Sequence, residues 1–200
     1  MKMVPLITFL SAVVYIYLAI YGLRMKPRTR LSSVFVVLCL CCALWAFCIA
    51  FMFSAGNPDS AWLWFRMSAP GWCLGPALLL HFSLVLTEDK ESSRYNKIQF
   101  LMYIPALIFT VIAMNQGLTA NTLTYEKFGW SPLNTGQSPG YWAFTLYYII
   151  CIISSIILVW RWGTRATLAR EKQQARIVVA CTVVGTLLAF INETLLPVLG

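Results

Sequence analysis

Six long apolar segments dominate this chain, and each is long enough to cross a lipid bilayer. A membrane-spanning helix needs about 20 mostly apolar residues. Inside lipid every backbone N–H and C=O needs a partner within the protein, so such segments fold as helices. The alternation of apolar and polar residues that is typical of a membrane barrel is absent. The six predicted spans are 3–23, 31–54, 61–86, 98–114, 141–160 and 177–199.

The composition agrees with a membrane protein. Of the 200 residues, 60% are hydrophobic and only 11% are charged, and the mean hydropathy is +0.73. A soluble domain is nearer about a quarter charged, so a disordered chain and a typical water-soluble enzyme are excluded. The first apolar segment lacks a basic start and a clear cleavage site, so we expect a retained helix. The sequence predicts one all-α polytopic domain over residues 1–200.

Positive charge is concentrated in the loops that follow the first, third and fifth predicted spans. These loops hold 12 of the 15 basic residues: Arg24, Lys26, Arg28, Arg30; Lys90, Arg94, Lys97; Arg161, Arg165, Arg170, Lys172, Arg176. Positive loops stay in the cytoplasm, so the N-terminus is predicted to lie outside. The net charge of +8 then reflects these loops, and we expect no nucleic-acid partner. Six spans return Gly200 to the outer side, and a seventh span is expected beyond it.

Ionisable residues inside a span are costly and are candidates for function. Arg66 lies roughly 7 to 8 Å inside the outer end of the third predicted span, at about 1.5 Å per residue. Glu193, next to Asn192, lies roughly 6 Å from the outer edge of a core about 30 Å thick. We therefore predict that Arg66 and Glu193 pair near the outer mouth, where Asn192 and this pair bind a ligand. The alternative is that both charged side chains reach separately to lipid headgroups.

The third predicted span carries two further features of interest. His81, the one histidine of the chain, lies toward its inner side, either as a hydrogen-bonded packing residue or as a pH-sensitive switch. Pro70 and Pro76 are expected to kink the helix, because proline lacks the backbone N–H and clashes with the preceding turn. Such a kink either serves packing or exposes backbone groups to a pocket.

Residues 117–140 form the longest predicted loop, and it lies on the outer side. Gly129 and Pro132 are among the residues that mark turns in it. One interpretation is a capping loop on the bilayer surface, with Phe128 and Trp130 as interfacial anchors. The other is a lid over an outward-facing ligand pocket.

The seven cysteines all lie in apolar segments, and their spacing fits neither a disulfide framework nor a metal site. They are Cys39, Cys41, Cys42, Cys48, Cys73, Cys151 and Cys181. Cysteine inside a span is mostly a small apolar filler. We therefore expect no metal and no cofactor.

Several motifs occur together along the chain. On the third span, Arg66 and Pro76 precede the run His81-Phe82-Ser83-Leu84-Val85-Leu86-Thr87. The entry to the sixth span reads Arg170-Glu171-Lys172-Gln173-Gln174-Ala175-Arg176. Further on, Asn192 precedes Pro197-Val198-Leu199-Gly200. With the basic first loop and Trp45 of the second span, this pattern resembles the N-terminal seven-transmembrane sensor region of bacterial histidine kinases and related signalling proteins.

The resemblance implies a multi-pass signal-input domain in the cytoplasmic (inner) membrane, without catalytic motifs of its own. Its implied partners are the lipid bilayer, an unidentified small ligand or membrane stimulus, and cytoplasmic signalling domains in cis, with a homodimer left open. A kinase or cyclase domain would follow in the full-length protein. The alternative is a small transporter or channel, which needs a continuous polar path, and the middles of three spans offer almost none. A membrane enzyme would need several ionisable groups at one level, and the spans hold one carboxylate.

Overall fold

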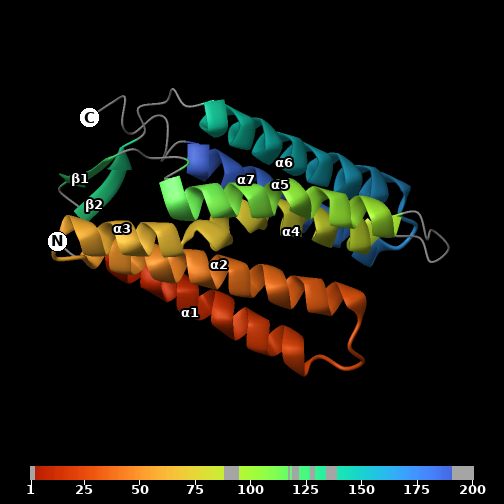
Figure 1. The fold of residues 1–200 in the computed structure, drawn as a ribbon. Helices are drawn as coiled ribbons and strands as arrows, with labels where there is room; N and C mark the ends of the chain where they lie inside the picture. Colours follow the sequence, from red (N-terminus) through yellow and green to blue (C-terminus); the bar gives the residue numbers. More distant parts are fainter. Residues whose placement is uncertain are drawn as a thin grey trace.

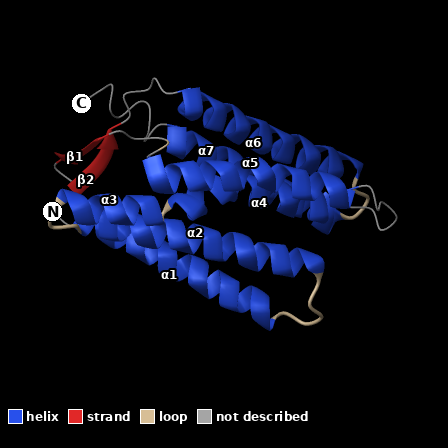
Figure 2. Ribbon diagram, viewed as in Figure 1, coloured by secondary structure: helices blue, strands red, loops and turns tan. Residues whose placement is uncertain are grey.

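The computed structural model describes residues 3–87, 95–116, 118, 122–126, 129–133 and 139–190. Within this part, seven helices run side by side in an elongated bundle, and one two-stranded sheet lies at one end (Figures 1 and 2). The elements are α1 (Met3–Arg24), α2 (Arg30–Ser54), α3 (Pro58–Met67), α4 (Ala69–Thr87), α5 (Tyr95–Gln116), β1 (Thr122–Glu126), β2 (Gly129–Leu133), α6 (Pro139–Arg165) and α7 (Ala169–Phe190). The predicted all-α architecture is confirmed.

Four helical segments are long and apolar enough to cross a membrane. They are Met3–Arg24, Arg30–Ser54, Pro58–Thr87 and Pro139–Arg165. Helix α5 contains a shorter apolar stretch, Leu101–Asn115. Helix α7 begins at Ala169, before the predicted start of the sixth span, and residues 191–199 of that span lie outside the described residues.

The third predicted span, 61–86, is divided into two helices. Helix α3 ends at Met67, and α4 begins at Ala69. Ser68 forms the connection, and its N–H still donates to the Trp64 carbonyl over 3.0 Å. The division falls two residues before Pro70, whose ring interferes with the preceding turn and which has no N–H to donate. The helix therefore stops and restarts at this point, whereas it continues through Pro76 inside α4.

Local sequence explains where two of the helices begin. At the start of α2, Thr29 accepts a hydrogen bond from the Ser32 N–H, and the Ser32 hydroxyl accepts one from the Thr29 N–H in return. At the start of α3, the Asn57 side chain accepts a hydrogen bond from the Ser60 N–H over 2.8 Å. Pro58 follows in the first turn, where a missing N–H costs nothing. These two caps determine where α2 and α3 begin.

Helix α4 is the centre of the bundle. It packs against α2, α5 and α6, while α1 packs on α2 and α7 on α6. The α2–α4 contact is closest at Gly71, where an added Cβ would lie 2.6 Å from Trp45 Cβ and 3.0 Å from the Cys41 carbonyl oxygen. Small residues allow such close backbone contact between membrane helices, where packing and not water exclusion drives association.

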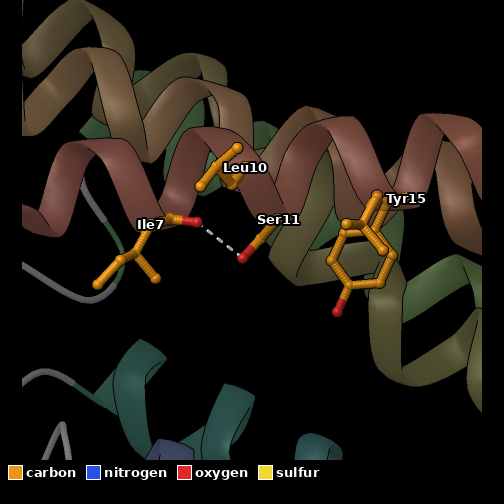
Figure 3. A pocket seen from close by; sticks show the side chains of 5 residues that line it. Ile7, Leu10, Ser11 and Tyr15 are labelled. Carbon is orange, nitrogen blue, oxygen red and sulfur yellow. Dashed lines mark hydrogen bonds between the residues drawn. The ribbon is translucent and has the colours of Figure 1, made fainter.

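One side of α1 is open. Side chains spaced three or four residues apart along it border a hollow of about 370 Å³. Ile7 and Tyr15 extend to the same side of the helix, and the Ser11 hydroxyl donates back to the Ile7 carbonyl over 3.0 Å (Figure 3). Most of this helix is exposed and apolar, as expected for a surface that contacts lipid or another helix.

The ends of the bundle differ in charge and structure. The α1–α2 and α6–α7 connections lie at one end, and the β1–β2 hairpin lies at the other (Figure 1). These two connections and the helix ends that they join carry nine of the basic residues. The predicted orientation requires this arrangement. We refer to the hairpin end as the outer end and to the basic end as the inner end, following that prediction.

Candidate functional site

The predicted outer loop contains a β-hairpin that docks on α2 and α3. Strands β1 and β2 pair antiparallel, with Thr122 opposite Leu133 and Glu126 opposite Gly129. Leu123 and Trp130 pack against a group that we call the docking cluster: Met52, Ala61, Phe65, Ile49, Phe53, Ala55, Trp62 and Trp64. The Trp130 indole N–H donates to the Ala55 carbonyl over 2.9 Å. One of the two interpretations of the loop takes Trp130 as an interfacial anchor; the structure shows that Trp130 holds the loop to the end of α2, and Phe128 lies outside the described residues.

Gly129 makes this docking geometrically feasible. Its φ angle is +120°, a backbone conformation that is nearly restricted to glycine. An added Cβ would overlap the Phe53 carbonyl oxygen and lie 3.2 Å from Phe53 Cα. The predicted turn glycine is therefore required both for its conformation and for the direct contact between hairpin and helix.

The same loop also reaches the other side of the bundle. Leu118 is buried in a group that we call the central cluster, together with Ala69, Cys73, Ala113 and Phe144. This cluster joins α4, α5 and α6, whereas the docking cluster joins α2, α3 and the hairpin. The described residues of the loop therefore contact both groups of helices at this end.

Trp72 lies beside the central cluster, in the first turn of α4. Its ring meets Phe144 edge-on at 5.0 Å between centroids. Its indole N–H is buried and finds no acceptor among the described residues. A buried indole N–H normally has a partner, so a polar atom at this position would be stabilised. Sequence reasoning missed Trp72, because Trp is common in membrane proteins at sites without any ligand.

Arg66 lies on α3, at the hairpin end of the bundle. Arg66 is exposed in the last turn of α3, and its guanidinium carbon lies 5.7 Å from the centroid of the Trp62 ring, a cation–π distance. Asn192 and Glu193 lie outside the described residues. Helix α7, which leads to them, packs on α6. The Arg66–Glu193 pair stays a prediction.

His81 takes part in a contact between helices near the inner end. Its Nδ1 lies 2.8 Å from the Tyr103 hydroxyl, and the two rings meet edge-on at 5.8 Å. Both residues border a mostly apolar hollow of about 190 Å³ between α2, α4 and α5, which Ser33 and Leu78 also line. Tyr103 was missed from the sequence because its partner lies on a different helix, and no local spacing connects them.

Two side chains at the interruption at Ser68 donate hydrogen bonds to backbone carbonyl groups. The Ser68 hydroxyl is fully buried and donates to the Phe65 carbonyl over 2.6 Å. From α2, the Cys41 thiol lies 3.2 Å from the Gly71 carbonyl and 3.5 Å from that of Pro70. Cys41 is thus more than a filler, since it contacts the backbone that Pro70 disturbs. The break between α3 and α4 is well packed. It lies between α3, which contributes to the docking cluster, and α4, which contributes to the central cluster.

These features together define a class of protein. The chain is an all-helical membrane bundle with a covered outer end and a basic inner end. The family model for the N-terminal 7TM region of histidine kinase matches residues 7–198. The chain therefore belongs to this family, as the sequence motifs indicated. No curated protein and no solved structure matches it at a significant level.

Proposed function

We propose that this chain is a sensor domain that receives a stimulus at its outer end and passes it to cytoplasmic signalling domains in the same protein. Family membership supports the sensor class. The observation that carries the proposal further is that the loop contacts two groups of helices, with Trp130 bonded to Ala55 and Leu118 buried in the central cluster. A stimulus that moves this lid changes how the two groups are held together.

The break at Ser68 suggests how such a change is transmitted. Helix α3 packs mainly with α2 and touches strand β1 and α5, whereas α4 packs with α2, α5 and α6. A ligand that binds one packing better than another shifts the balance between them. A tilt of α3 about Ser68 then shifts the position of α4. Because His81 lies further along α4, this shift alters its contact with Tyr103. This contact is the proposed inner switch.

The ligand region is the outer mouth beneath the lid. Arg66 and Trp72 lie in α3 and the first turn of α4, and Asn192 and Glu193 complete the predicted site. Arg66 supplies a charged donor, and Trp72 supplies a buried N–H that has no acceptor among the described residues. The site would suit a small molecule or a lipid headgroup with hydrogen-bond acceptors.

The wider assignment follows from the same proposal. The N-terminus lies outside, the domain is a multi-pass protein of the cytoplasmic membrane, and a seventh span leads to the output domains. Reading the coding sequence beyond Gly200 tests this part directly. A seventh apolar span followed by a kinase or cyclase domain is expected, and an unrelated extracellular domain would contradict it.

A matched pair of glycine variants tests lid control of signalling. The full-length protein is assayed in membrane vesicles for autophosphorylation with labelled ATP. Gly129→Ala forces the lid off α2, so the output is expected to shift at least threefold in either direction. Gly56→Ala is the control, because an added Cβ there meets nothing within 4 Å. Equal output from wild type and both variants, at equal amounts of folded protein, would remove the lid from the account.

A further inference from the structure

The inner end of α6 carries a charged surface that the sensor function does not use. Helix α6 has 27 residues, which gives a length of about 40 Å at 1.5 Å per residue. The hydrocarbon core is only about 30 Å thick. One or both ends of α6 therefore pass through the headgroup layer of the membrane.

A single stripe of α6 shows which side faces lipid. Exposed apolar residues recur at three- and four-residue spacing along it: Leu146, Ile149, Ile153, Ile157 and Trp160. Residues at this spacing share one side of a helix. The same stripe continues beyond Ile157, through Arg161 to Arg165, and both arginines are exposed. The lipid-facing surface thus changes from isoleucine to tryptophan and then to arginine, the order expected where a helix leaves the hydrocarbon.

The α6–α7 contact fixes the direction of these two arginines. An added Cβ at Gly163 would overlap the Ala175 Cβ, so Gly163 faces α7 directly. Arg161 and Arg165 are each two residues from Gly163, which is about 200° around the helix. Both therefore point away from α7 and toward the surrounding lipid.

Neither arginine is neutralised within the described residues. Among residues 139–190, Glu171 is the one acidic residue, and it forms no ion pair with Arg161 or Arg165. Guanidinium groups bind phosphate oxygens with two parallel hydrogen bonds, and their charge matches an anionic headgroup.

We propose that Arg161 and Arg165 bind the phosphate groups of anionic phospholipids in the inner leaflet. Trp160 lies at the boundary with the hydrocarbon, and the arginines lie about 6 and 12 Å beyond Ile157. This depth matches the headgroup layer. The inference depends on membrane embedding and holds whether or not the domain is a sensor.

Spin-labelled lipids in vesicles that contain the chain provide the test. The measured quantity is the association constant of spin-labelled phosphatidylglycerol relative to spin-labelled phosphatidylcholine, from electron paramagnetic resonance spectra. Each juxtamembrane basic residue contributes about a fivefold preference. In the variant Arg161→Gln/Arg165→Gln, the preference for phosphatidylglycerol at the lipid sites beside these two residues is therefore expected to fall roughly 10- to 30-fold. Most of the preference averaged over all lipid sites around the chain should be lost.

A second double variant controls for net charge. Arg170→Gln/Lys172→Gln removes two positive charges from the exposed first turn of α7 and should lower the preference clearly less than the stripe variant does, because these two residues do not lie on α6. Arg161→Lys/Arg165→Lys keeps the charge and should retain part of it, and unchanged helix content in circular dichroism confirms folding. Equal loss in the two Gln variants would overturn the assignment to the stripe. A wild-type chain without preference for phosphatidylglycerol would overturn lipid binding and favour an acidic protein partner.

Discussion

The crossing of α2 and α4 at Gly71 gives a prediction whose size can be worked out from distances. In Gly71→Ala the new Cβ would lie 2.6 Å from Trp45 Cβ, 2.9 Å from Trp45 Cα and 3.0 Å from the Cys41 carbonyl oxygen. Carbon atoms in contact are normally about 3.5 to 4.0 Å apart. The two helices must therefore separate by about 1 Å. Two of the three contacted atoms are backbone, so no side-chain rotation relieves the overlap.

Gly71→Ala is expected to lower the free energy of unfolding, and Gly75→Ala is its matched control. Overpacking of this kind destabilises by about 1–3 kcal/mol, and replacing glycine by alanine inside a helix returns about 0.5–1 kcal/mol. Gly75→Ala measures that gain alone, because an added Cβ there meets nothing within 4 Å. We expect Gly71→Ala to be less stable than Gly75→Ala by about 2 kcal/mol, with a separation that also weakens the Cys41 thiol contact to the Gly71 carbonyl.

Equilibrium unfolding in mixed micelles, with increasing dodecyl sulfate and far-ultraviolet circular dichroism, measures this difference. The predicted order of stability is Gly75→Ala, then wild type, then Gly71→Ala. If Gly71→Ala is as stable as Gly75→Ala, the helices do not cross at Gly71, and the central position of α4 is wrong.

Two further substitutions test individual contacts. Trp130→Phe removes the indole N–H and leaves the Ala55 carbonyl without its donor, which costs about 1–3 kcal/mol. Because docking protects the hairpin, amide exchange over 122–133 should become faster by roughly 10- to 100-fold. Unchanged exchange would contradict docking through Trp130. Tyr103→Phe removes the hydroxyl that lies 2.8 Å from His81 Nδ1 and should lower stability in the same micelle assay by about 0.5–1.5 kcal/mol; a variant as stable as the wild type would show that this contact does not hold α4 to α5.

The sequence predicted the helices well because apolar length is a strong signal in a membrane protein. The first two spans match α1 and α2 to within one residue at each end. Pro70 indicated a disturbance in the third span, but the exact break at Ser68 depends on the packing of α3 with α2 and the hairpin. Propensity along one segment does not contain that information.

The candidate site was harder to predict, because its contacts join distant parts of the chain. Arg66 was found at the outer end from depth alone, while the docking of Trp130 on Ala55 spans 75 positions. The hairpin itself has no alternating strand pattern strong enough to distinguish it from a loop with several turns. Tyr103 and Trp72 are ordinary residues of apolar helices, and only their neighbours in space give them a role.

The central claim is that the lid at the outer end controls the packing of the inner end. Amide hydrogen exchange in nanodiscs tests it most directly, with Gly129→Ala compared with Gly56→Ala. We predict that Gly129→Ala changes exchange at least threefold in the inner turns of α2 and α4, around Ser33 and His81, while Gly56→Ala leaves them unchanged. A change confined to residues 49–67 and 122–133 would show that the lid moves without any effect on the inner end, and it would contradict the account.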